Sequence, residues 1–263
     1  MLEASETQSL PSIIGDALKR LVFAVQDYSL LTFQSITNIV TPPQYWFDAL
    51  EQMDVIGVGS LPIVVLTGFF IGGVMVLQTA SQFERFGETA LTGDAVSLAL
   101  VRELGPAITA LLVAGRNASG MASELGSMVV TEQVEALQSM GVSAVKVLVT
   151  PRLLASLITV PMLTVFADIV GVYGGYYMAW LRVHMSPYTY WHSVQTTLIF
   201  SDFYKGLEKA AVFGVLVALV AGYEGFRAEG GAEGVGRVTT QAVVTAIILI
   251  FVFNFALSFV LFP

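Results

Sequence analysis

Long apolar stretches separated by short polar segments dominate this 263-residue chain. A helix that crosses the hydrocarbon of a bilayer needs about 20 mostly apolar residues. Five stretches meet this length, at residues 55–79, 98–122, 147–180, 207–226 and 239–262. The third is too long for one straight crossing, so we expect it to tilt, protrude or bend at Pro161. The pattern predicts an all-α integral membrane protein with five transmembrane helices.

The segment ahead of the first span has a different pattern. Apolar residues recur at helical spacing over 12–40, but charged residues such as Asp16, Lys19 and Asp27 interrupt them too often for a comfortable span. We therefore predict an interfacial amphipathic segment at 12–53, with an elbow helix lying along the membrane, and a sixth span as the alternative. Residues 1–11 lack the features of a signal peptide and are expected to be disordered. The five-span domain then covers 54–263.

One polar segment, residues 123–151, lies between the second and third spans. It contains a predicted helix at about 124–141 that is too short and too polar to cross a bilayer. Its exposed face carries Glu132, Gln133 and Glu135, and Gly141 stands where a C-cap glycine is expected. A polar helix held between two spans is a suitable docking point for a cytoplasmic partner.

The distribution of lysine and arginine predicts the orientation, because these residues are enriched in cytoplasmic loops. Seven fall on the side of the polar helix if the N-terminus is cytoplasmic: Lys19, Arg20, Arg116, Lys146, Arg152, Arg227 and Arg237. The opposite side receives Arg85 and Arg182, together with Arg102, Lys205 and Lys209 at the membrane edge. The bias places the polar helix in the cytoplasm and the C-terminus outside.

Composition narrows the function classes. The chain is 55% hydrophobic and 12% charged, has no cysteine and carries a net charge of −8, which argues against nucleic acid as a partner. His184 and His192 lack nearby carboxylates, so no metal site is predicted. The glycine-rich run at 229–237 lacks the Gly-Lys-Ser/Thr ending of a phosphate loop and is expected to be a flexible loop. No catalytic site is expected.

Small residues recur every four positions along the second span and allow two helix backbones to approach closely. One row is Ala110, Ala114, Ala118, Ala122 and Gly126, and the other is Gly115, Ser119, Ser123 and Ser127. Gly68-x-x-x-Gly72 and Gly171-x-x-x-Gly175 are weaker examples of the same pattern. These rows predict either packing within one subunit or a dimer interface.

Ionisable residues at the edges of apolar spans are costly and often functional. Arg102 and Glu103 open the second span, Lys205, Glu208 and Lys209 open the fourth, and Asp168 lies within the third. A cationic cluster at the outer face would suit a phosphate headgroup. The alternative is a set of interfacial ion pairs with snorkelling side chains.

The segment 100–152 resembles the MlaE/YrbE family, the permeases of MCE-associated ABC transporters. The resemblance is carried by ELGP at 103–106, AGR at 114–116, SELGSM at 123–128, TEQVEAL at 131–137, MG at 140–141 and PR at 151–152. It implies a homodimer that works with two ATPase subunits, an MCE-domain protein and a small STAS-type cytoplasmic subunit. It also implies phospholipid transport between inner and outer membranes, which maintains the lipid asymmetry of the outer membrane.

The resemblance further implies roles for individual residues. Glu132, Gln133, Glu135 and Leu137 would couple the permease to a groove of the ATPase, which would hold ATP and Mg²⁺, so that this chain needs no cofactor and is not an enzyme. Arg102, Glu103 and Lys205 are the expected contacts to the lipid headgroup. Leu77 and Phe251 are the expected contacts to the tails.

Two other functions remain open at this point. One is a proton-coupled secondary transporter with Glu103, Asp168 and Glu208 as its relay, although the chain shows no convincing internal repeat. The other is a membrane scaffold without transport, which would have little reason to carry charges at membrane depth.

Overall fold

A computed structural model describes residues 10–262. The disorder predicted for residues 1–11 falls outside this part for residues 1–9, whereas Leu10 and Pro11 already belong to a helix. Every regular element in the described part is helical. The elements are α1 (Leu10–Val40), α2 (Trp46–Met53), η1 (Asp54–Val58), α3 (Gly59–Glu84), η2 (Thr89–Leu91), α4 (Thr92–Ala99), η3 (Leu100–Leu104), α5 (Gly105–Val113), η4 (Ala114–Ala118), α6 (Ser119–Val130), α7 (Gln133–Ser139), η5 (Val145–Val149), α8 (Thr150–Arg182), α9 (Pro187–Thr197), α10 (Phe200–Gly225) and α11 (Gly231–Leu261).

Five continuous helices in the described part are long and apolar enough to cross a membrane, which confirms the predicted number of spans. They cover Trp46–Glu84, Thr89–Val130, Val145–Arg182, Phe200–Gly225 and Gly231–Leu261. Three of them contain 38 residues or more, well beyond the roughly 20 that a bilayer needs, and therefore protrude from the hydrocarbon. The third span stays helical through Pro161. The protein is a multi-pass membrane protein.

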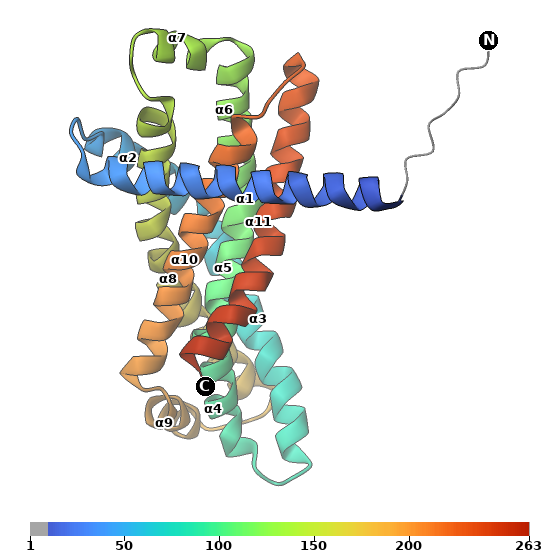
Figure 1. Ribbon diagram of the computed structural model, residues 1–263. Helices are drawn as coiled ribbons and strands as arrows, with labels where there is room; N and C mark the ends of the chain where they lie inside the picture. Colours follow the sequence, from blue (N-terminus) through green and yellow to red (C-terminus); the bar gives the residue numbers. More distant parts are fainter. Residues whose placement is uncertain (1–9, 263) are drawn as a thin grey trace.

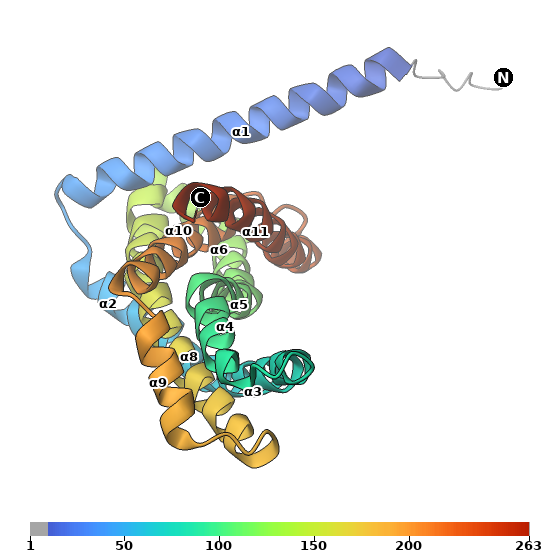
Figure 2. The same ribbon diagram turned by 90° about the horizontal axis from the view of Figure 1, so that it is seen from below.

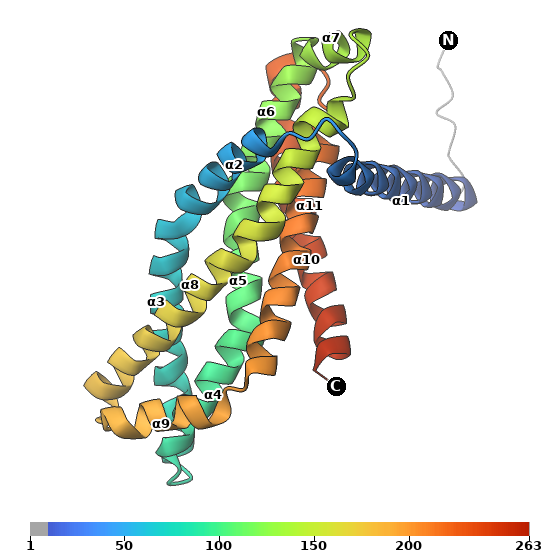
Figure 3. The same ribbon diagram turned by 90° about the vertical axis from the view of Figure 1, so that its left-hand side faces the viewer.

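The five spans form one elongated bundle with two distinct ends (Figure 1). At the α7 end lie α7, the connection between α10 and α11, and the start of the first span. At the α9 end lie α9, the 85–91 connection and the end of α11 (Figure 3).

Helix α1 lies across the bundle near the α7 end instead of running along it (Figures 1 and 2). It packs on α8, α10 and η5 and exposes large apolar side chains, among them Phe23, Phe33 and Ile36. This is the arrangement of a helix that lies on a membrane surface, although the interfacial position itself stays a prediction. The helix begins at Leu10, and α2 continues into the first span. The structure therefore places no break at the domain boundary expected after residue 53.

Closest packing in the bundle occurs between α3 and α8, where the two GxxxG sequences face each other within one chain. A Cβ added at Gly72 would overlap the carbonyl oxygen of Gly171, and one added at Gly174 would overlap that of Phe69. Only glycine allows two backbones to approach this closely. These glycines therefore join the first and third spans of one subunit.

Replacing Gly72 by leucine is expected to prevent normal folding, because the side chain would have to displace the backbone of α8. Overpacking a well-packed core costs about 1–3 kcal/mol or more. The measurement is the yield and thermal unfolding of the full chain in detergent. Gly120→Ala is the matched control, because a Cβ at Gly120 meets nothing within 4 Å. Wild-type unfolding of the leucine variant would contradict this packing.

The two rows of small residues in the second span have different surroundings. Ala110, Ala114, Ala118 and Ala122 are fully buried in the chain's own core. Gly126 packs against Ala228 and Val238 in the same way. The other row faces outward, since Gly115 and Ser127 are exposed and Ser119 and Ser123 are partly so. The first row therefore serves packing within the subunit, and only the second is available to another chain.

The glycine-rich run at 229–237 is not the loop that the sequence predicted. Helix α11 begins at Gly231, and only Glu229 and Gly230 precede it. Gly230 has a φ of 83°, a left-handed conformation that glycine adopts without strain, and it turns the chain between α10 and α11. Arg237 consequently stands on the second turn of a helix.

Candidate functional site

Two polar features stand out, one at each end of the bundle. At the α7 end, the second span continues to Val130 before the chain turns at Glu132 into the short helix α7. The helix predicted at 124–141 is thus two pieces, because residues 124–130 extend the span and only Gln133–Ser139 form the separate helix. Glu132 has a φ of 60°, a conformation that is sparsely populated outside glycine and is often found at functional positions.

Side chains beneath α7 hold it against the bundle. Val134 is buried and Leu137 half-buried, and both pack on a cluster that includes Leu125, Leu148 and Phe226. Glu132, Gln133 and Glu135 are exposed. The outer face is therefore acidic and polar, and the inner face is apolar. Leu137 packs towards the inner face, and its contact with a partner stays a prediction.

An ion pair between the stems of this hairpin fixes its geometry further. The guanidinium of Arg152 on α8 lies 2.7 Å from the carboxylate of Glu124 on α6 and donates a hydrogen bond to the carbonyl oxygen of Leu148. Arg152 is 5% exposed. The ion pair thereby ties the second span to the third span close to α7.

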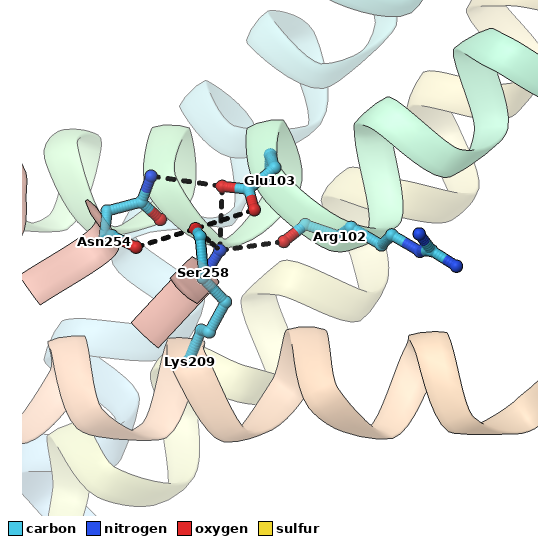
Figure 4. Close-up of polar contacts among 5 residues, drawn as sticks. All are labelled: Arg102, Glu103, Lys209, Asn254 and Ser258. Carbon is cyan, nitrogen blue, oxygen red and sulfur yellow. Dashed lines mark hydrogen bonds and ion pairs between the residues drawn. The ribbon is translucent and has the colours of Figure 1, made fainter. Parts of the chain in front are cut away.

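At the α9 end, a hydrogen-bonded network joins α10, α11 and η3 (Figure 4). The ammonium of Lys209, which is fully buried, lies 2.8 Å from a carboxylate oxygen of Glu103 and donates to the carbonyl oxygen of Arg102 and to Ser258. Asn254 and Ser258 both donate to the Glu103 carboxylate. Because every charge has a partner, the network is a stable polar cluster at membrane depth.

The Arg102 side chain points away from Glu103 (Figure 4) and pairs with Asp202 at 2.8 Å. The aromatic ring of Phe262 lies 5.1 to 5.5 Å from the cationic groups of Arg102, Lys205 and Lys209. The group formed by these residues carries three cations against two paired carboxylates, so the group itself, though not the whole end of the bundle, has an excess of positive charge. We name it the α9-end cluster: Arg102, Glu103, Asp202, Lys205, Lys209, Asn254, Ser258 and Phe262.

Three of the five charged residues of the second span lie in its π-helical turns. Arg102 and Glu103 lie in η3, and Arg116 and Asn117 lie in η4. The Arg116 guanidinium donates to the carbonyl oxygen of Val55 and to Ser60 in the first span. Such turns inside long helices are frequent at functional positions. In this chain the π-helical turns direct polar side chains towards neighbouring spans.

The structure brings some of the predicted site residues together and leaves others apart. Arg102, Glu103 and Lys205 join one cluster. Phe251 lies on α11 one turn before Asn254 and is exposed, whereas Leu77 is exposed on α3, a helix that does not pack closely on α11. Sequence reasoning missed Asp202, Asn254, Ser258 and Phe262. A signal for two of them exists, because Asn254 and Ser258 stand four residues apart in an otherwise apolar run.

The three carboxylates of the alternative proton relay do not form a chain. Glu103 is paired with Lys209, Glu208 is exposed, and Asp168 is buried on α8 next to Gly105. No hydrogen bond or ion pair links any two of them. This arrangement gives a proton no continuous path through these groups.

Comparison with known proteins decides the family. The model of the MlaE permease family matches residues 49–260, about four-fifths of the chain. The chain belongs to the MlaE permease family. This result confirms the family that the resemblance of residues 100–152 indicated. The match extends over all five spans.

Relatives of this MlaE-family permease cover most of its length. A probable ABC transporter permease protein of Rickettsia bellii is 38% identical over 250 residues, which is 95% of this chain and 96% of that protein. The intermembrane phospholipid transport system permease protein MlaE of Haemophilus influenzae is 35% identical and covers 81% of this chain and 82% of the relative. The chloroplastic protein TRIGALACTOSYLDIACYLGLYCEROL 1 of Arabidopsis thaliana is 33% identical over 87% of this chain and 65% of its own length.

Proposed function

We propose that this chain is the membrane subunit of an ABC transporter that moves phospholipids between the inner and outer membranes of a bacterium and so maintains outer-membrane asymmetry. The observation that carries the proposal is the rigid α7 hairpin of an MlaE-family permease, a polar lever on a chain with no recognisable ATP site of its own. The relative named as an intermembrane phospholipid transport permease supports the substrate class.

The coupling role follows from how α7 is held. A separate ATPase subunit, which binds ATP and Mg²⁺, would contact the exposed Glu132, Gln133 and Glu135. Because Val134 and Leu137 fix the helix on the bundle and Arg152 ties α8 to α6, a push on α7 would tilt the second and third spans together. Rigid-body tilting of this kind is a common way for a distant site to open or close.

The α9-end cluster is the proposed contact for the lipid headgroup. Its excess positive charge suits a phosphate, and its lysines and arginine are natural donors to phosphate oxygens. Lys205 is the cation least committed to an ion pair within the cluster, so it is the first candidate donor. Phe251 is exposed one turn before Asn254, which supports a path for the lipid tails along α11. Leu77 would contact the same lipid only across a boundary between two subunits.

A homodimer provides that boundary, and the outward row at Gly115, Ser119 and Ser127 is its proposed interface. The chain has no cysteine, so a single introduced cysteine can report on contacts between copies. Ser119→Cys is expected to give a disulfide-linked dimer under mild oxidation in membranes. Leu66→Cys, at an exposed position on α3, should remain monomeric. Equal cross-linking of both variants would contradict the interface.

The cytoplasmic side of the membrane is assigned to the α7 end by the lysine and arginine distribution, with the N-terminus inside and the C-terminus in the periplasm. An MCE-domain protein is then the expected partner at the α9 end and a small STAS-type subunit at the cytoplasmic side.

Affinity purification of the tagged chain from native membranes in gentle detergent tests this assembly. Mass spectrometry is expected to identify an ATPase subunit, an MCE-domain protein and bound phospholipid. A chain that purifies without an ATPase would contradict the proposed function.

A further inference from the structure

A polar cavity lies at the α7 end, far along the bundle from the α9-end cluster. It has a volume of about 420 Å³ and lies between the end of α10 and the start of α11. Its lining residues are Glu224, Arg227, Glu229, Arg237, Val238, Gln241 and Thr245. The proposed coupling and headgroup roles use none of these side chains.

The charged groups of this cavity form no close ion pairs with one another. Two arginines and two glutamates line it, yet none of the four forms an ion pair with another of them within 4.0 Å. Arg227 donates a hydrogen bond to the hydroxyl of Tyr223 and lies over its ring. Ion pairs elsewhere in the described part, such as Lys209 with Glu103, are formed. A cavity whose positive and negative side chains are kept apart suits a ligand that carries both a positive and a negative group.

Contacts to α1 fix the level of this cavity in the membrane. Tyr28 of α1 stacks on Tyr223 with ring centroids 3.9 Å apart, and its hydroxyl donates to Glu224. Burial, together with the neighbouring Glu224 carboxylate, raises the pKa of Tyr28, so that hydroxyl remains a donor. At its predicted interfacial position, α1 would mark the boundary between hydrocarbon and headgroups. The cavity would then lie at headgroup level.

An adjoining groove gives the site an apolar side. Leu30 and Leu31 of α1 and Phe226 line it, together with Asp27, Gln34, Tyr223 and Arg227. Arg227 belongs to both the groove and the cavity. A polar cavity that opens beside apolar side chains fits an amphipathic molecule better than a free ion.

We propose that this cavity binds the headgroup of a zwitterionic phospholipid of the cytoplasmic leaflet. Arg227 and Arg237 would hold the phosphate, Glu224 and Glu229 the ammonium group, and the groove along α1 the first part of the acyl chains. The inference depends on the proposed placement of the α7 end at the cytoplasmic face. It gives the permease a lipid site at each end of the bundle.

Photo-crosslinking of the full chain in liposomes tests the site. The probe is a phosphatidylethanolamine with a photoreactive group near its headgroup, and peptide mapping locates the labelled residues. Labelling is expected on residues 224–245. Arg227→Ala/Arg237→Ala should lower it by about tenfold or more, because charged hydrogen bonds to the phosphate are lost. Both side chains are exposed, so the fold should persist. Glu229→Gln should shift the preference towards phosphatidylglycerol, which has no ammonium group.

Arg85→Ala/Arg182→Ala is the matched control, because it removes two exposed arginines at the α9 end and should leave this labelling unchanged. Unlabelled phosphatidylethanolamine should compete, whereas inorganic phosphate and glycerophosphoethanolamine should not. Equal labelling of the double variant, or competition by the free headgroup alone, would overturn the proposal. Labels on 200–210 and 251–262 report the α9-end cluster separately, so failure of one site is distinguishable from failure of the other.

Discussion

Reversing two charges on α7, Glu132→Lys together with Glu135→Lys, is expected to separate the permease from its ATPase and stop lipid transport. Both carboxylates are exposed on the outer face of α7 and lie outside the apolar cluster that holds the helix. The substitutions therefore change the docking surface and leave its support intact. We propose that the ATPase presents cations to these carboxylates; lysines there would then face like charges, which cost several kcal/mol, so binding should fall by about a hundredfold or more.

Co-purification of the ATPase with tagged permease measures this loss, and thermal unfolding of the permease confirms that the fold survives. Glu132 already adopts a left-handed backbone conformation, and lysine there bears a similar strain, so the turn should persist. Glu84→Lys/Glu88→Lys is the control, since it makes the same charge change on exposed residues at the opposite end. Normal ATPase binding by the α7 variant would show that coupling occurs elsewhere.

Replacing Lys209 by methionine is the change expected to cost the most stability. The Lys209 ammonium is the partner of Glu103 and a donor to Ser258 and to the backbone of Arg102. Without it, the Glu103 carboxylate stays at membrane depth with only neutral donors. Breaking a buried ion pair costs about 3–5 kcal/mol, and we expect the lower end of that range because Glu103 retains 38% exposure.

Thermal unfolding of the full chain in detergent provides the measurement. The double variant Glu103→Gln/Lys209→Met should recover most of the stability, since it leaves no unpaired charge. Lys205→Met is the single-site control, because the Lys205 ammonium contacts the Phe262 ring and forms no ion pair within the described residues. Unfolding of Lys209→Met at the wild-type temperature would mean that the pair contributes nothing to stability.

Hydropathy alone predicted the number of spans, because an apolar run of about 20 residues has few other stable locations. The ends of the helices were less predictable. The second span continues to Val130 and the fifth begins at Gly231, since helices that protrude from the bilayer can carry polar residues such as Glu124 and Arg237. Hydropathy cannot separate the protruding turns of a long helix from a loop.

Parts of the site could be read from local sequence, and parts could not. Arg102, Glu103 and Lys209 were visible as charges at span edges, but their pairing depends on how η3, α10 and α11 pack. The pattern of α7 identified Glu132, Gln133 and Glu135, yet it could not show that Leu137 faces inward. The spacing of small residues in the second span likewise could not show that one row is buried and the other is exposed. The cavity lined by Arg227 and Arg237 lies between α10 and α11, beside the short turn that connects them. The sequence pattern had predicted a longer loop there.

The most direct test of the central claim is lipid movement by the permease and its ATPase, reconstituted together in liposomes with a fluorescent phospholipid. ATP hydrolysis is expected to drive the transfer, and Glu132→Lys/Glu135→Lys should abolish it while a proton gradient alone has no effect. Transfer that follows the proton gradient and ignores ATP would contradict the account and would instead support a secondary transporter.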